Sequence, residues 1–223
     1  MMNTDFSQTK ICITLDIKTP ITPIYAIMNL SCDTCLKATQ RVRIRLATYE
    51  GSLTKTPDLY IRIFSLMNAG VHTEIWFNNF RIAAIGGESR QNCLEIQEMD
   101  PGILDSPQGW HIVELPIHNG EKALDFISKV RSLPIRYDIN VAECSLPKYC
   151  LDQIDQDLDC CHPETWDSLF CSQFALLFLR YCSKQGMLRI PKQKEKLLWS
   201  VNSKGCLPSR LQIITDRIFG AQT

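Results

Sequence analysis

The sequence predicts an α+β fold in which an antiparallel β-sheet packs against helices. Strand patterns and a hairpin occupy the first half of the chain, and helical patterns dominate the second half. Of the 223 residues, 45% are hydrophobic and 22% are charged, which is typical of a globular chain that can bury a core. A single domain is the simplest organisation for a chain of this length.

Strands are predicted where apolar and polar residues alternate and where turn residues follow. In the first of them, Val42, Ile44 and Leu46 share one face and the intervening arginines share the other. Asn78-Asn79 is a tight-turn sequence between two strand patterns, so a hairpin is expected there. The predicted strands are residues 41–46, 71–77, 81–85, 93–97 and 110–115.

Helices are predicted from apolar residues three or four positions apart and from capping residues. The longest helix is expected to be capped by Asp167 or Ser168 and to end before Gly186, with residues 170–181 buried. The predicted helices are residues 57–67, 120–133, 168–184 and 208–219. The basic run at residues 189–196 predicts a solvated loop, with a phosphate-binding patch as the alternative.

The charge balance and the cysteine pattern limit the compartment and the partners. The 24 basic and 24 acidic residues balance, so no overall field draws the chain to nucleic acid or to an anionic membrane. A signal-peptide pattern is absent, and no stretch reaches the roughly 20 apolar residues that span a bilayer. Eleven cysteines without a regular framework favour free thiols. We therefore expect a cytoplasmic protein without stable membrane insertion.

Two cysteine clusters raise the alternative of a zinc site. Cys32 and Cys35 form a C-x-x-C pair, and Cys160-Cys161-His162 is a second cluster. Structural zinc sites usually show two clean ligand pairs at recognisable spacing. Loop thiols and no bound metal are therefore expected, with zinc left open as the alternative.

Cys171 is a candidate nucleophile because it lies in the first turn of the long predicted helix. Unpaired N–H groups and the positive end of the helix dipole favour a thiolate there, and the same groups can receive an oxyanion. A buried structural cysteine is the alternative interpretation. Cys206 is a second-choice nucleophile, and its Gly and Pro neighbours also fit a structural role.

His72 is the candidate base. Strand periodicity of two places His72 and Glu74 on the same face of their strand. A carboxylate beside an imidazole fixes the tautomer and raises the basicity of the ring, as in a nucleophile, base and orienter arrangement. A His and a Glu on a solvent-facing strand would give the same pattern, and that alternative stays open.

The order of these motifs resembles a known family. The segments VHTEIWF, Tyr137-Asp138, WDSLFCSQFALLFLRY and NSKGCLPSRL resemble the circularly permuted NlpC-type branch of the papain-like cysteine hydrolases, which has bacterial and large-DNA-virus members. In that branch a strand of the form H-x-E-hydrophobic precedes a helix that opens C-S-E/Q-hydrophobic, the reverse of the papain order. The resemblance implies a permuted papain-like domain at residues 41–223, after an N-terminal extension or extra strand at residues 1–40. Residues 142–163 lie outside it and predict an insertion or lid.

The resemblance also implies roles for individual residues. Cys171 corresponds to the nucleophile, His72 to the base and Glu74 to their polar partner. Related branches take that partner from the next strand, where Asn79 or Glu88 is available. Gln173 stands where many members have Glu. The implied substrate or oxyanion region consists of Ser172, Gln173, Tyr137, Asp138, Asn202 and Ser203.

The expected function is thiol-dependent cleavage of an amide or isopeptide bond in a protein or peptide substrate, as by a cysteine peptidase, without a cofactor. One alternative is a lipid-directed thiol acyltransferase or phospholipase, which also places His before Cys but usually needs a membrane anchor. The other is a catalytically silent binding module on the same scaffold. The resemblance makes a viral protein of the host cytoplasm or the virion one expectation, and it leaves the oligomeric state open.

Overall fold

The structure is a computed structural model, which describes residues 42–50, 71–86, 92–105, 107–138 and 157–220. The chain divides into two units, residues 1–39 and residues 40–223, and every described residue belongs to the second unit. The sequence predictions that fall outside the described residues are the extension at 1–40, the helix at 57–67, Glu88, residues 142–156 of the insertion, and the Cys32 and Cys35 pair.

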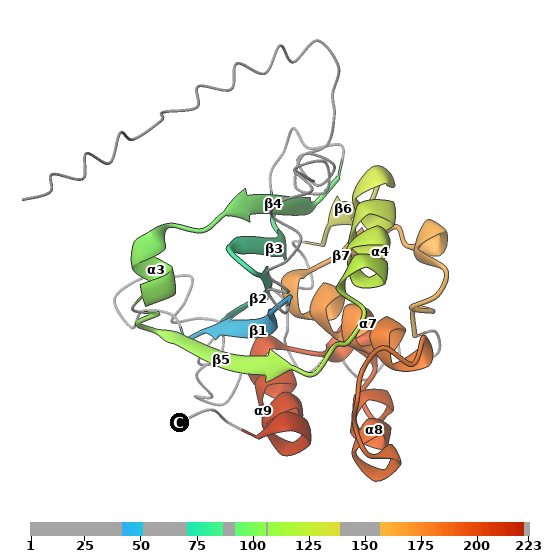
Figure 1. The fold of residues 1–223 in the computed structure, drawn as a ribbon. Coiled ribbons are helices and arrows are strands. Elements are labelled where there is room, and N and C mark those ends of the chain that lie inside the picture. Colours follow the sequence, from blue (N-terminus) through green and yellow to red (C-terminus); the bar gives the residue numbers. More distant parts are fainter. Residues whose placement is uncertain (1–41, 51–70, 87–91, 106, 139–156, 221–223) are drawn as a thin grey trace, which may run out of the picture. The chain divides into compact units, whose positions relative to one another are not determined.

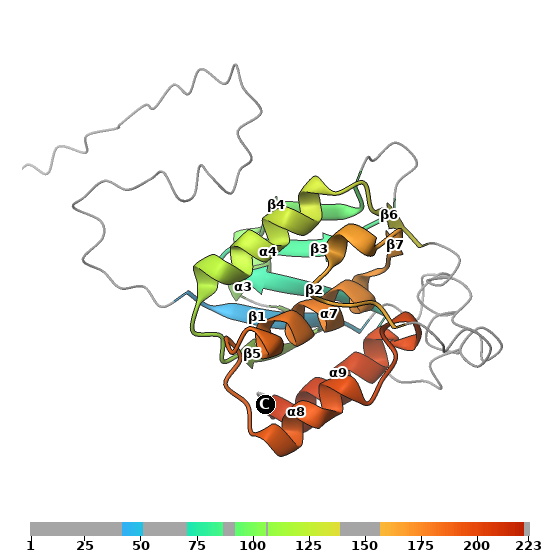
Figure 2. The same ribbon diagram turned by 90° about the vertical axis from the view of Figure 1, so that its right-hand side faces the viewer.

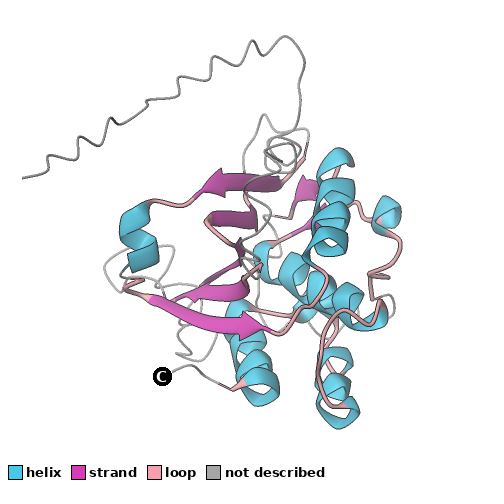
Figure 3. Ribbon diagram, in the orientation of Figure 1, coloured by secondary structure: helices cyan, strands magenta, loops and turns pink. Residues whose placement is uncertain are grey.

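A five-stranded antiparallel sheet with helices forms the described part of the chain, which confirms the predicted α+β class (Figure 1, Figure 3). The strand order is β4-β3-β2-β1-β5, and each neighbouring pair is antiparallel. The strands are β1 (Ile44–Tyr49), β2 (His72–Phe77), β3 (Phe80–Ala84), β4 (Leu94–Glu98) and β5 (Trp110–Leu115). All five predicted strands are present: β5 has the predicted bounds, and the other four differ at one or both ends. Strand β2 lies at the centre of this order, so its backbone is held from both sides.

The predicted hairpin joins β2 to β3. Asn78 has a φ of 53°, a left-handed conformation that asparagine tolerates better than most residues. Its Oδ1 accepts a hydrogen bond from the backbone N–H of Arg43 at 3.0 Å. The turn fixes a register in which Trp76 lies opposite Arg81.

Helices α4 and α7 lie on one face of the sheet, in front of the strands in Figure 2. The α-helices are α3 (Pro101–Asp105), α4 (Gly120–Ser132), α7 (Cys171–Lys184), α8 (Lys192–Trp199) and α9 (Pro208–Phe219). Helix α7 packs against β2 and β3, α9 packs against β5 and β1, and α8 packs against α7 and α9. Within the described ranges, no helix is both long enough and apolar enough to cross a lipid bilayer.

The main core lies between the sheet and α7. Phe174 and Phe178 of α7 are fully buried together with Ile75 of β2, which confirms the predicted buried helix. Trp76, the next residue of β2, belongs to a smaller cluster, where Ile103 of α3 packs on it. Successive strand residues point to opposite faces, so these two clusters lie on the two faces of the sheet.

The predicted start of the long helix is wrong. Ser168–Leu169 form a short strand, β7, which pairs in parallel with β6 (Arg136–Tyr137). This pairing holds the backbone extended up to Phe170, which is the N-cap of α7. Helix α7 therefore begins at Cys171, which is its first residue rather than a residue further inside the first turn.

The prediction of a loop for the basic run 189–196 is also wrong, because α8 begins at Lys192. The extended backbone of Pro191 precedes the helix, and prolines are common at helix starts. Leu198 is fully buried, while Lys192 and Lys196 are exposed. The Lys194 ammonium also donates to the carbonyl oxygen of Ile218, and the Ser183 hydroxyl donates to Glu195, so polar contacts help this leucine to dock the helix.

A buried arginine in α7 ties the helix to its surroundings. The side chain of Arg180 is 1% exposed and pairs with Asp157 at 2.7 Å. The guanidinium also donates to the carbonyl oxygens of Leu198 and Val201. Asp157 accepts hydrogen bonds from both the N–H and the Oγ of Ser203. The network joins α7, the end of α8 and the short helix η2 (Ser203–Gly205).

Replacement of Arg180 by Met should strongly destabilise the fold. The variant keeps most of the side-chain volume but removes the charged partner of Asp157 and leaves two carbonyl groups without their donor. Breaking a buried ionic network by removing one partner costs about 3 kcal/mol or more. Urea unfolding should show a loss of that size in the free energy of unfolding. The exposed Arg189→Met control should change it by less than about 0.5 kcal/mol, and equal effects of the two variants would contradict the network.

Candidate active site

The first turn of α7 places the Cys171 thiol against the start of β2. The backbone N–H groups of Thr73 and Ser172 donate hydrogen bonds to the sulfur. N–H groups in the first turn of a helix have no carbonyl partner inside the helix, so they are available to an anion at this end. Cys171 is 5% exposed. The sulfur therefore lies in a buried position with several hydrogen-bond donors around it.

His72 and Glu74 flank this thiol from β2. The side chains of His72 and Cys171 are hydrogen-bonded to each other. Nε2 of His72 lies 3.3 Å from Oε1 of Glu74. The imidazole is 28% exposed and the carboxylate is 2% exposed, so the histidine is the accessible member of the group. The structure thus brings together the three residues that the sequence predicted as nucleophile, base and polar partner.

Glu74 is held by two further side chains. The indole N–H of Trp76 donates to Oε2 at 3.0 Å, which leaves Oε1 for the histidine. Nε of Arg81, on β3, lies 3.8 Å from Oε1. A buried carboxylate needs such partners, because an unpaired charge away from water is very costly. The carboxylate is therefore fixed in one orientation beside the imidazole.

The charges of the site favour a thiolate and an imidazolium. Burial opposes the charge on His72, but the Cys171 thiolate and the Glu74 carboxylate outweigh burial and raise the pKa of His72 to about 10. Burial also opposes the thiolate of Cys171, but the imidazolium and the two backbone N–H groups hold its pKa below the ordinary value. The two groups therefore exist as an ion pair at pH values between their two pKa values.

Glu74 remains ionised in this arrangement. Burial favours its neutral form, but the hydrogen bond and the charge of His72, the Trp76 indole and the Arg81 charge together outweigh burial. The pKa of Glu74 is therefore below its ordinary value. The carboxylate can hold the imidazolium by charge as well as by orientation.

Four other described thiols have a raised pKa, whereas the pKa of Cys171 is lowered. Burial raises the pKa of Cys93 to about 11, that of Cys160 to about 12 and that of Cys206 to about 12. Burial also raises the pKa of Cys182. Cys206, the second-choice nucleophile, is thus a buried neutral thiol. The carbonyl oxygen of Cys206 accepts a hydrogen bond from the hydroxyl of Ser172 at 2.6 Å. This bond joins the Cys206 backbone to the first turn of α7.

Two predicted neighbours of the nucleophile support the helix start. The N–H of Ser172 contacts the Cys171 sulfur, while its hydroxyl is fully buried against the Cys206 segment. Oε1 of Gln173 accepts the N–H of Phe170 at 3.4 Å. Gln173 therefore satisfies a backbone donor at the helix end, as the Glu or Gln of a capping box does.

Tyr137 and Asp138 lie next to the site at the end of β6. Gly86 allows the Tyr137 ring to approach closely, because a Cβ at Gly86 would lie 3.0 Å from its Cδ1. Oδ2 of Asp138 accepts the hydroxyl of Ser168 at 3.1 Å, and its N–H donates to the carbonyl oxygen of Leu169 at 2.9 Å. These contacts fix the short β6–β7 ladder that leads into α7.

Asn202 and Ser203 have structural contacts. Oδ1 of Asn202 accepts the N–H of Lys204 at 2.9 Å and caps η2. Ser203 is fully buried and bonds to Asp157. Both contacts shape the segment that precedes Cys206, whose carbonyl oxygen accepts the Ser172 hydroxyl.

Among the described residues, Glu74 is the polar partner of His72. Asn79 follows β2 at the hairpin, at the opposite end from His72, and its Nδ2 donates to Glu98 at 3.2 Å. The alternative that placed Asn79 beside His72 is therefore wrong. Glu88 lies outside the described residues.

Sequence reasoning missed Trp76 and Arg81. The same periodicity of two that joined His72 to Glu74 also places Trp76 on their face, so the indole could have been found. Arg81 follows from the hairpin register, because it lies opposite Trp76. The N–H of Thr73 had no signal in the sequence, since every residue except proline carries that group.

No family model, no curated protein and no solved structure matches this chain. Support for a function therefore comes from the geometry and the charges of the site itself.

Alkylation of Cys171 by iodoacetamide should persist at low pH. At pH 6 an ordinary cysteine of pKa about 8.5 is only roughly 0.3% thiolate, whereas the lowered pKa keeps more of Cys171 ionised until the pH falls through that pKa. The pH profile of alkylation, followed by mass spectrometry, should have a midpoint below that of an ordinary cysteine. His72→Ala removes the imidazolium and should move the midpoint upward. An unchanged midpoint would contradict the ion pair.

Trp76→Phe should weaken the site by removing one hydrogen bond while keeping a ring in place. A hydrogen bond to a charged group contributes about 1.5–3 kcal/mol, so unfolding should show a loss in that range. The alkylation midpoint of Cys171 should rise by less than it does in His72→Ala. Trp110→Phe is the matched control, because Trp110 packs in the same cluster and its ring lies 5.3 Å from that of Trp76 in a tilted arrangement. The same shift in both variants would assign the effect to packing instead.

Proposed function

We propose that the protein is a cysteine hydrolase that cleaves amide or isopeptide bonds, with a peptide or protein as substrate. The observation that carries this proposal is the hydrogen-bonded contact of Cys171 and His72, with Glu74 3.3 Å from the imidazole. Nucleophilic catalysis needs a nucleophile that contacts a base and an orienting group that contacts the same base. Cys171 is the nucleophile, His72 the proton carrier and Glu74 the group that orients the ring.

The reaction follows from these positions. The Cys171 thiolate attacks the carbonyl carbon, and the carbonyl oxygen becomes an oxyanion beside the N–H groups at the start of α7. The His72 imidazolium then protonates the leaving nitrogen, the C–N bond breaks, and a thioester remains on the sulfur. Water attacks the thioester and gives its proton to His72. The C–S bond breaks, the carboxylic acid leaves, and the ion pair is restored.

The protonation states fit both halves of this cycle. The lowered pKa of Cys171 supplies a nucleophile without a separate deprotonation step. The raised pKa of His72 keeps a proton ready for the leaving amine. Activity should therefore fall at acidic pH as the thiolate is protonated, and at alkaline pH as the imidazolium loses its proton.

A permuted papain-like fold is part of the same proposal. The base is in the central strand β2, and the nucleophile follows much later in the chain at the start of α7. Helix α7 packs directly on β2, which is how residues so distant in sequence come together. This order of strand and helix agrees with the resemblance of the sequence motifs.

Cys171→Ala should abolish hydrolysis of a mixture of fluorogenic peptide amides. Loss of the nucleophile should lower the rate by at least about 10³-fold, and His72→Ala should have a similar effect because the residues act as a unit. Cys161→Ser is the matched control, since its thiol has no contact with the site, and it should retain the wild-type rate. Mass spectrometry should detect the thioester on Cys171 in the wild type. Equal rates in Cys171→Ala and the wild type would leave a binding module as the function of this scaffold.

A further inference from the structure

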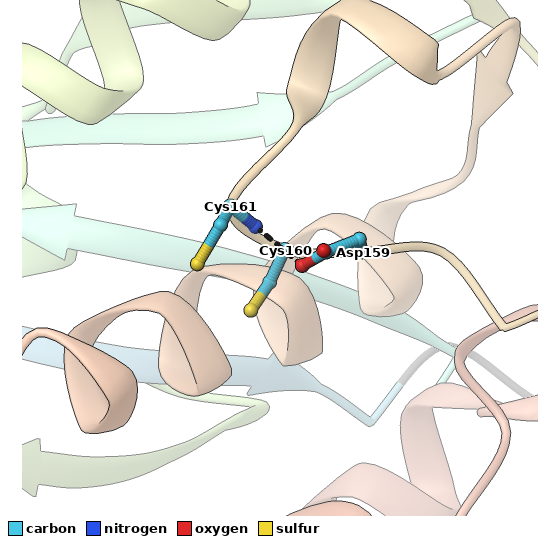
Figure 4. Close-up of side chains that lie close together, drawn as sticks. All are labelled: Asp159, Cys160 and Cys161. Carbon is cyan, nitrogen blue, oxygen red and sulfur yellow. Dashed lines mark hydrogen bonds between the residues drawn. The ribbon is translucent and has the colours of Figure 1, made fainter.

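Asp159, Cys160 and Cys161 form a cluster of potential metal ligands in the turn that precedes η1 (Pro163–Thr165) (Figure 4). One carboxylate oxygen and the two sulfur atoms all lie within 4.8 Å of one another. Figure 4 shows both sulfur atoms on the same side of the turn. The turn lies against the end of α7, because Lys184 of that helix is 3.2 Å from Asp159. The three donors thus belong to a packed part of the fold.

The turn is held in shape by its own hydrogen bonds. Oδ1 of Asp159 accepts the N–H of Cys161 at 2.9 Å. The carbonyl oxygen of Asp159 accepts the indole N–H of Trp166 at 3.0 Å and the backbone N–H of His162 at 3.2 Å. Cys160 is 1% exposed, so its thiol cannot turn freely into solvent. The donors are therefore close to one another before any ion binds.

His162 supplies a second, independent indication of a metal site. Its Nδ1 lies 2.9 Å from Oε1 of Glu164, and Glu164 is itself paired with Lys129 at 2.9 Å. Nε2 of the same ring lies 4.0 Å from Oδ2 of Asp159. Histidines that bind metals usually hold one ring nitrogen on a carboxylate and use the other for the ion. His162 holds Nδ1 on Glu164 in this way, and its Nε2 is left as the second ring nitrogen near the Asp159 carboxylate.

The donor set matches a particular kind of cation. Two thiolates, one carboxylate and one imidazole make four ligands, which is the number that zinc takes in a tetrahedral site. Ligand atoms around a tetrahedral zinc ion are about 3.3–3.8 Å apart, so the Asp159 oxygen and the two sulfur atoms need to close by only about 1 Å. The exposed side chain of His162 must turn toward them to complete the set. Thiolate ligands select zinc and softer ions over magnesium or calcium.

Lys184 marks the cluster as a place for positive charge. Its ammonium lies 3.2 Å from Oδ1 of Asp159, in the last turn of α7. The C-terminal end of a helix carries partial negative charge, which also favours a cation. An ion that binds Asp159 must displace this ammonium, so the lysine competes with the metal.

We propose that Asp159, Cys160, Cys161 and His162 form a binding site for Zn²⁺ or a similar thiophilic divalent cation. The ion would hold this turn in a fixed shape, at a place separate from the Cys171 and His72 pair. The zinc alternative raised by the sequence combined this cluster with the Cys32 and Cys35 pair. The ligand set proposed here takes all its donors from one turn. The proposal does not depend on the proposed hydrolase activity.

Cobalt(II) titration of the full chain, reduced and freed of metal, tests the site directly. The Cys171→Ala variant is the background, because it removes the other thiol that has His and Glu neighbours. One Co²⁺ per chain should bind with the charge-transfer absorption of cobalt thiolates and the intense visible bands of a tetrahedral ion. Added Zn²⁺ should abolish both signals by displacement.

Substitutions at three exposed positions and at the half-buried Cys161 keep the test independent of folding. Cys161→Ser should remove the thiolate absorption in part and lower the affinity by at least about 100-fold, and Asp159→Asn should lower it by about 10- to 100-fold. Glu164→Gln, which weakens the support of His162 and the pair with Lys129 but removes no ligand, should lower the affinity about tenfold. Lys184→Met should raise the affinity, because the competing ammonium is gone.

Cys93→Ala is the control, since it removes a buried thiol on another element and should leave the titration unchanged. Circular dichroism should show that each variant is folded. Absence of thiolate absorption in the Cys171→Ala background would overturn the proposal. So would equal affinity in folded Cys161→Ser, Asp159→Asn and background proteins.

Discussion

The packing of the first turn of α7 against the start of β2 is the contact on which the site depends. It places the Cys171 sulfur among the N–H groups of Thr73 and Ser172 and within hydrogen-bond reach of His72. The β6–β7 ladder sets where the helix can begin, because it keeps the backbone extended up to Phe170. A helix that began a turn earlier would carry the thiol away from these donors. The local pairing of two very short strands thus determines the chemistry of the thiol.

Buried charge is compensated in two separate places in this fold. Glu74 is satisfied by His72 and Trp76, and the result is a fixed carboxylate behind an imidazolium. Arg180 is satisfied by Asp157 and backbone carbonyls, and the result is a fixed position for α7 between neighbouring segments. Burial makes each charge costly without its partners. The first network therefore fixes the base on β2, and the second fixes the helix that carries the nucleophile.

The sequence predicted what depends on local pattern. Alternation in β2 placed His72 and Glu74 on one face, and the same alternation places Trp76 with them. The start of α7 was not predictable in this way, because Ser168 is a good capping residue and only its pairing with a distant strand prevents that role. The choice of the third residue likewise required the hairpin register. Contacts between segments far apart in the chain leave no periodic signal in the sequence.

The protonation state of His72 is the most direct measure of this account. Nitrogen-15 NMR of labelled histidine distinguishes an imidazolium from either neutral tautomer, and it can follow the ring through a pH titration. In the wild type the His72 signals should remain those of an imidazolium at neutral pH and should titrate near the raised pKa of about 10. In Cys171→Ala the titration should move to lower pH, because the thiolate is gone. A His72 ring that is neutral at pH 7 in the wild type would contradict the ion pair and the proposed catalytic cycle.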